Sequence, residues 1–86
     1  MSKLFRLSIH TPFKTVFEGE ASMLSVPGSA GYLQVLGDHA PIVVSLTKGR
    51  ITYRDSLEKT TSFNIEGKGV LEVLKNNATL LLENAL

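Results

Sequence analysis

Cysteine and tryptophan are both missing from this chain of 86 residues, and neither sign of charge is in clear excess. Without cysteine there is no disulfide framework and no thiolate metal site. Nine basic and eight acidic residues leave a formal net charge of +1. That balance gives no electrostatic basis for a nucleic-acid partner, so we expect none.

Long hydrophobic runs are missing as well. The uninterrupted apolar runs are only a few residues long, whereas a membrane-spanning helix needs roughly 20. The first stretch, Met1–Phe13, has no long apolar core and no small-residue cleavage site of the kind found in secretory signals. We expect a soluble protein that meets a membrane only through its partners.

Short segments that alternate between apolar and polar residues are what the chain has in abundance, and this period of two is typical of half-buried strands. Turn-forming residues separate these segments, and Asn76-Asn77 supplies the positive φ angles of a tight hairpin. The tail from Leu80 could instead form a helical turn, but the hairpin signal favours a strand to Leu82. Strands are expected at Lys3–Ile9, Thr15–Phe17, Ala21–Val26, Tyr32–Leu36, Ile42–Leu46, Ile51–Tyr53, Leu57–Ile65, Val70–Leu74 and Ala78–Leu82. The pattern predicts an all-β sandwich or barrel in one domain, residues 1–86.

The segment from Val26 to Leu46 carries the densest turn signals. It opens with the expected turn Pro27-Gly28 and contains a compact loop over residues 37–41, Gly-Asp-His-Ala-Pro. Proline and glycine fix unusual backbone angles, so this loop should hold one shape. A shaped loop on a β scaffold is commonly a docking surface.

Catalytic or metal-binding chemistry has little support in the sequence. Asp38 beside His39 could orient a general base, but a histidine bonded to backbone or packed on Pro41 is the more ordinary interpretation. His10 and His39 match no metal-ligand spacing. No serine lies in a nucleophile elbow, and neither glycine-rich stretch, at 28–31 or at 67–69, completes a phosphate loop. We expect no active site, no metal and no cofactor.

An ordered series of motifs resembles a known family over nearly the whole chain. These motifs are Thr11-Pro12, Phe17-Glu18-Gly19-Glu20-Ala21, Val26-Pro27-Gly28 with Gly31, His39-Ala40-Pro41, Leu46-Thr47-Lys48-Gly49, Leu71-Glu72-Val73 and Asn77-Ala78-Thr79-Leu80. Each is weak alone, but together and in order they resemble the N-terminal β-sandwich of the epsilon subunit of F-type ATP synthase, called delta in mitochondria.

The resemblance implies a flattened β-sandwich of about ten short strands in two sheets. It implies a non-catalytic subunit of the central stalk, which packs against the gamma subunit and the ring of c subunits and reaches the catalytic head through the complex. Its work would be mechanical, coupling ion-driven rotation to ATP synthesis. Its place would be peripheral, on the cytoplasmic face of the energy-coupling membrane.

The resemblance also places the loop that faces the c ring. It falls on two segments, whose residues are Ser29, Ala30, Gly31, Tyr32, Leu33, Gly37, Asp38 and His39. Tyr32 would be an interface anchor there, because exposed aromatic residues are common hot spots. The alternative is that Tyr32 only covers the edge of the sandwich.

The chain departs from the family pattern in two ways. Lys68 separates Gly67 and Gly69, where relatives commonly have adjacent glycines. The sequence also ends at Leu86, where many relatives continue into an inhibitory two-helix hairpin; a subunit without that hairpin is expected to couple but not to inhibit. The sequence leaves two alternative functions open. One is a lipoyl- or biotinyl-type carrier domain modified at Lys68, and the other is a small hydrolase that uses Asp38 and His39.

Overall fold

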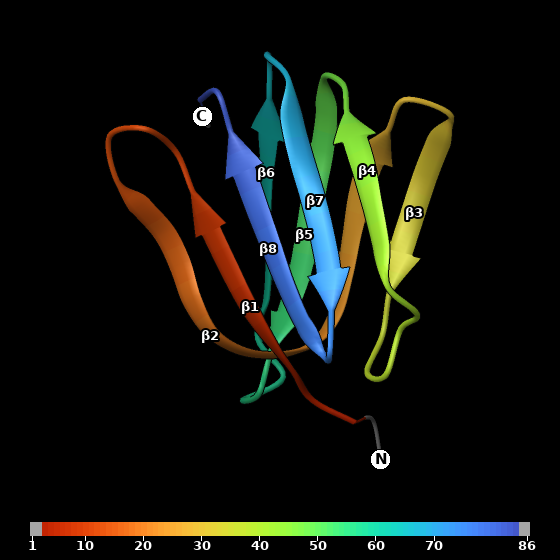
Figure 1. The fold of residues 1–86 in the computed structure, drawn as a ribbon. Coiled ribbons are helices and arrows are strands. Elements are labelled where there is room, and N and C mark those ends of the chain that lie inside the picture. Colours follow the sequence, from red (N-terminus) through yellow and green to blue (C-terminus); the bar gives the residue numbers. More distant parts are fainter. Residues whose placement is uncertain (1–2, 85–86) are drawn as a thin grey trace.

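The computed structural model describes residues 3–84 and consists of eight strands joined by short turns, with no helix among these residues (Figure 1). The strands are β1 (Phe5–His10), β2 (Thr15–Gly28), β3 (Gly31–Val35), β4 (Ile42–Leu46), β5 (Gly49–Asp55), β6 (Thr60–Ile65), β7 (Gly69–Leu74) and β8 (Asn77–Leu82). The all-β class is confirmed, and the chain runs as a strand to Leu82 rather than as a helical turn. The number of strands is eight, not about ten.

The predicted break at Glu18–Glu20 is wrong, because β2 is one strand of 14 residues. Gly19 sits in the ladder opposite Leu7 of β1, and Glu18 and Glu20 point to solvent. Pairing with β1 therefore overrides a local composition that is unfavourable for a strand.

Strand β2 bends back on itself and serves both layers of the sandwich (Figure 1). Its first half pairs with β1, and its second half pairs with β3 and β5. The register with β5 shifts between Ala21 and Met23, which marks a bulge. The bulge changes which side chains face the core, from Ala21 before it to Leu24 after it. One extra residue thus carries the strand from one layer to the other.

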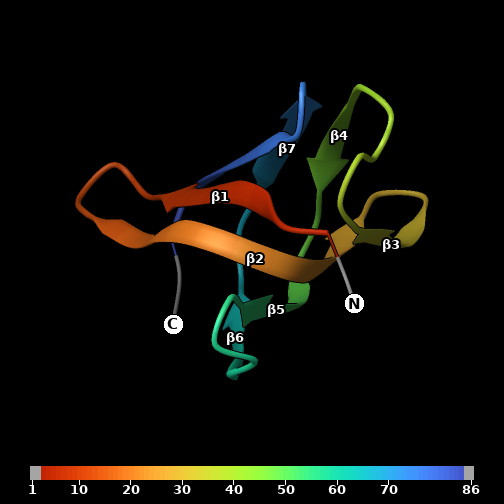
Figure 2. The ribbon, with the colours of Figure 1, turned by 90° about the horizontal axis from the view of Figure 1, so that it is seen from below.

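The strands follow the order β1-β8-β7-β4-β2-β5-β6, with β3 added on β2. Figure 2 looks along the molecule and shows β7 and β4 on one side of β2 and β5 and β6 on the other. Strand β2 also pairs with β1 and touches β4 at Gly28 and Leu46. The two layers are therefore joined through β2 by backbone hydrogen bonds as well as by the core.

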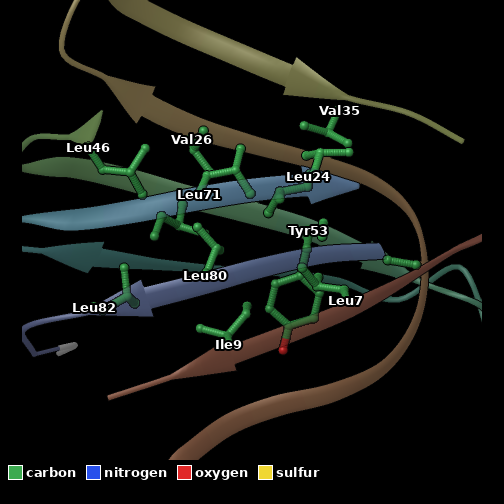
Figure 3. Close-up of a cluster of buried hydrophobic side chains, with 14 of the residues drawn as sticks. Leu7, Ile9, Leu24, Val26, Val35, Leu46, Tyr53, Leu71, Leu80 and Leu82 are labelled. Carbon is green, nitrogen blue, oxygen red and sulfur yellow. The ribbon is translucent and has the colours of Figure 1, made fainter. Parts of the chain in front are cut away.

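The core lies between the layers and is filled by buried side chains from all eight strands. Figure 3 shows these side chains converging, among them Leu7, Ile9, Leu24, Val26, Val35, Leu46, Tyr53, Leu71, Leu80 and Leu82. The first and last strands each bury one face, as their alternation predicts, since Phe5, Leu7, Ile9, Ala78, Leu80 and Leu82 are all buried. The ring of Phe17 packs 4.5 Å from that of Tyr53, centroid to centroid, at the margin of the core.

Two predicted turns are displaced by a residue or two. The β7–β8 turn uses Lys75 and Asn76, with φ of 51° and 62°, rather than Asn76 and Asn77. Strand β2 continues through Pro27 to Gly28, so the β2–β3 turn is made by residues 29 and 30. In both cases the ladder extends further than the turn-forming residues indicate, because the partner strand supplies hydrogen bonds.

Candidate partner-binding surface

The eight residues predicted to face the c ring lie at both ends of β3 (Figure 1). Ser29 and Ala30 form the β2–β3 turn, and Gly31, Tyr32 and Leu33 begin β3. The loop of Gly37, Asp38 and His39 follows the other end of the strand. Five residues of β3 rise roughly 15 Å, so the structure does not bring the two segments together into one loop.

The β2–β3 turn is fixed to the neighbouring strand β4. The backbone N–H of Ser29 donates to the carbonyl of Ser45 at 3.0 Å, and its hydroxyl donates to the same oxygen at 3.1 Å. Gly31 has a φ of 131°, a left-handed angle that favours glycine. The turn is therefore held in one conformation at this end of the sandwich.

Tyr32 is 65% exposed, yet its hydroxyl has a structural partner. The oxygen accepts a hydrogen bond from the backbone N–H of Arg50 at 3.0 Å. The side chain also closes over Gly49, where an added Cβ would lie 2.9 Å from the Tyr32 hydroxyl oxygen. Tyr32 thus covers this part of the sheet, and its role as an anchor for a partner stays a prediction.

The β3–β4 loop is held by contacts that come from outside it. Asp38 has a φ of 62°, and its backbone N–H donates to Asn76 Oδ1 at 2.8 Å. The carboxylate of Asp38 pairs with Lys3 Nζ, and this hydrogen bond with the attraction between the charges raises the pKa of Lys3 above its ordinary value of 10.5. The backbone N–H of His39 donates to the carbonyl of Leu36 at 3.2 Å. The loop is therefore shaped, as the sequence predicts.

Asn76 connects the loop to the beginning of the chain. Its Nδ2 donates to the carbonyl of Leu4 at 2.8 Å, and its own carbonyl accepts the N–H of Arg6 at 3.0 Å. The sequence pattern indicates Asn76 only as a turn residue and points to no role for Lys3 or Leu4. No local pattern could have revealed this contact, because Asn76 lies 38 residues after Asp38.

The hydrolase alternative finds no geometric support. The Asp38 carboxylate pairs with Lys3, while His39 Nδ1 lies 2.7 Å from the Ala40 carbonyl, so the pair is not arranged as a base and its orienting group. The other histidine, His10, places Nδ1 3.2 Å from the Thr15 hydroxyl. Within residues 3–84 no three metal-ligating side chains gather.

The carrier alternative requires a lysine at the tip of a tight hairpin. Lys68 lies instead on the connection between β6 and β7, and these strands pair with different neighbours. Its backbone N–H donates to Glu83 Oε1 at 3.2 Å. Lys68 is therefore on a crossover between layers, not on a swinging hairpin.

The outer face of the layer made by β4, β7 and β8 is partly apolar. Val43, Val70, Leu74 and Leu81 are all exposed there. A groove of about 640 Å³ runs along the end of this face, between the β1–β2 loop and the end of β8. Its lining includes Val70 and Leu81 beside Lys68 and Glu83. In the described part of the chain no helix is long and apolar enough to cross a membrane.

The sequence is similar to a family of known proteins over almost its whole length. The sequence profile described as "ATP synthase, Delta/Epsilon chain, beta-sandwich domain" matches residues 4–86. The chain belongs to this family. A relative named ATP synthase epsilon chain from Chlorobium limicola is 40% identical over 82 residues, covering 95% of this chain and 92% of its own. One from Caulobacter vibrioides is 36% identical and covers 100% and 96%.

Some members of the family are longer than this sequence. The epsilon chain of Koribacter versatilis is 36% identical, and the match covers 99% of this chain but 58% of the relative. Among solved structures, a chain of the Euglena gracilis mitochondrial ATP synthase superposes with a TM-score of 0.84 at 16% identity. The superposition covers 93% of this chain and 51% of the Euglena chain. A chain from the Tetrahymena thermophila central stalk and c-ring structure gives 0.80 at 16% identity, covering 94% and 64%. These superpositions confirm the fold.

Proposed function

We propose that this epsilon-family chain is a non-catalytic subunit of the central stalk of an F-type ATP synthase. It contacts the gamma subunit and the c ring and helps couple ion-driven rotation to ATP synthesis. The observation that carries the proposal is the family match over residues 4–86, which spans every strand of the structure. The chain acts peripherally, at the cytoplasmic face of the energy-coupling membrane.

The architecture suits the transmission of torque. A load that slides one layer over the other must break backbone hydrogen bonds, because β2 pairs with β1 in one layer and with β5 in the other. The core between them is close-packed, and such interiors deform little. A small sandwich of this kind can pass force between two partners without changing shape.

In this proposal the two segments at the ends of β3 face different parts of the stalk. Since they cannot form one loop, we propose that the β3–β4 loop of Gly37, Asp38 and His39 makes the ring contact. Asp38 is exposed in this loop, Gly37 and His39 are half-buried, and Asn76 holds the backbone in place. The segment from Ser29 to Leu33 then faces a different part of the stalk.

Restoration of coupled synthesis tests the proposal as a whole. Membranes stripped of their own epsilon chain should regain ion-driven ATP synthesis when this chain is added, and the isolated chain should hydrolyse no ATP. Failure to bind or to restore synthesis in stripped membranes from its own source would contradict the proposal.

Single cysteines can then map the ring contact, because the chain has none of its own. Ala30→Cys and His39→Cys would each carry a photo-crosslinker, with Asn64→Cys on β6 as a matched exposed control. The assignment predicts that position 39 crosslinks to the c subunit and position 30 does not. The reverse pattern would place the ring at the opposite end of β3.

A further inference from the structure

One side chain, that of Asn76, joins two segments that the sequence places far from it. Its Oδ1 accepts the N–H of Asp38 in the β3–β4 loop, and its Nδ2 donates to the carbonyl of Leu4 before β1. Both distances are 2.8 Å. The amide group therefore uses an acceptor and a donor at once, each on a different segment.

The joined segments also approach each other closely. A Cβ added to Gly37 would lie 2.5 Å from the Cβ of Lys3 and 2.7 Å from its carbonyl oxygen. The ion pair between Lys3 and Asp38 closes the same contact at the surface. The loop thus lies directly against Lys3 and Leu4, and Asn76 holds both segments from the turn of the β7–β8 hairpin.

The surface that results is composite. Its three segments each expose part of a leucine: Leu4 at 36%, Leu36 at 51% and Leu74 at 49%. Leu4 precedes β1, Leu36 begins the β3–β4 loop and Leu74 ends β7. A partner that docks on the loop meets a surface whose shape depends on the hairpin.

We propose that Asn76 is a positioning residue for partner binding, which holds the loop of Gly37, Asp38 and His39 in the conformation that its partner recognises. This inference rests on the proposed function for its partner, the c ring of the stalk. A loop released from Asn76 spends only part of its time in the competent conformation, and apparent affinity falls by that fraction. Each hydrogen bond lost shifts such an equilibrium by about two- to tenfold.

Two glycine variants of the same turn separate positioning from folding. Asn76→Gly removes both hydrogen bonds but tolerates the left-handed backbone, since glycine adopts a φ of 62° without strain. Lys75→Gly is the matched control, because Lys75 has a φ of 51° and makes no side-chain contact with the loop among the described hydrogen bonds and ion pairs.

The measurements are amide exchange at Asp38, binding of the full chain to stalk and c ring, and the denaturant midpoint. Asn76→Gly should lose most of the protection of the Asp38 amide and bind about tenfold more weakly. Its unfolding midpoint should fall below that of Lys75→Gly by no more than the loss of these two hydrogen bonds explains, with unfolding still cooperative. Lys75→Gly should bind like the native chain. Asn76→Asp keeps the acceptor for the Asp38 amide but loses the donor to Leu4. It should therefore restore the exchange protection of the Asp38 amide, and it should restore binding only in part.

The outcomes distinguish this inference from the proposed function. If the native chain does not bind the stalk, the proposed function fails, and so does the role of Asn76 in binding. If the native chain binds and Asn76→Gly binds equally well, the positioning role is overturned. It is overturned as well if Lys75→Gly weakens binding to the same extent, because the turn and not the amide group would then be responsible.

Discussion

At the scale of single residues, Ser22 places a polar side chain in an apolar, buried environment. It lies at the bulge of β2 and is 4% exposed, and its hydroxyl finds no hydrogen-bond partner in the described structure. An unpaired buried hydroxyl costs about 1–3 kcal/mol. Ser22→Ala should therefore raise the free energy of unfolding by about 1 kcal/mol in chemical denaturation. The exposed Ser45→Ala should change it by less than about 0.5 kcal/mol, and a destabilised Ser22→Ala would show that the hydroxyl is satisfied after all.

The ion pair of Lys3 and Asp38 gives a prediction about protonation. Because the pKa of Lys3 is raised above 10.5 in the folded chain, the stabilisation linked to the charged lysine is present below that pH wherever Asp38 is ionised. Its contribution is lost as the pH rises through the raised pKa. Asp38→Asn should return the pKa of Lys3 to its ordinary value, as followed by the chemical shift of the lysine Cε during titration. An unchanged pKa in Asp38→Asn would mean that the pair does not persist in solution.

Variants of Tyr32 can distinguish its structural hydrogen bond from a contact with a partner. Tyr32→Phe keeps the ring but removes the oxygen that accepts the Arg50 N–H. Since water can reach this exposed site, the loss of stability should be no more than about 1 kcal/mol. Thermal unfolding measures that loss, and binding to the stalk measures the other role. If Tyr32→Phe binds the stalk normally and Tyr32→Ala does not, the aromatic side chain of residue 32 is an anchor for the partner.

At the scale of the elements, strand β8 offers two adjacent leucines on opposite faces. Leu80 is fully buried in the core, whereas Leu81 is 55% exposed. Leu80→Ala should lower the free energy of unfolding by about 2–5 kcal/mol, through lost burial and the cavity left behind. Leu81→Ala should cost far less in the same denaturation experiment. Equal losses in the two variants would mean that the alternation of β8 is misplaced.

The elements also show what the sequence can and cannot predict. Alternation identified the buried faces of β1 and β8 and the full extent of β4, because one face of each is apolar. It failed at β2, where Gly19 has the composition of a turn but pairs with β1. Ladder hydrogen bonds depend on the partner strand, and a local pattern contains no information about that partner.

The candidate surface was less predictable than the fold. The motif series led to the β3–β4 loop, and its turn residues correctly indicated a fixed shape. What fixes that shape is Lys3, Leu4 and Asn76, which lie outside the segment considered. The motif series also grouped two segments that β3 holds apart. Contacts between residues distant in sequence were the missing information for the loop, whereas the separation of the two segments follows from the length of β3 alone.

At the scale of the whole molecule, the account depends on a sandwich whose two layers are joined by one bent strand. The bulge between Ala21 and Met23 lets β2 pair with β1 in one layer and β5 in the other. A rigid body of this kind, with a shaped loop at one end and an apolar face along one layer, suits a part that links two partners.

The most direct test is to purify the tagged full chain from cells of its source and identify the attached proteins by mass spectrometry. The proposed function predicts recovery of the gamma subunit, the c ring and the catalytic head, with no added mass on Lys68. Recovery of a dehydrogenase or carboxylase complex, with Lys68 modified, would contradict it, as would a preparation that contains no ATP synthase subunits.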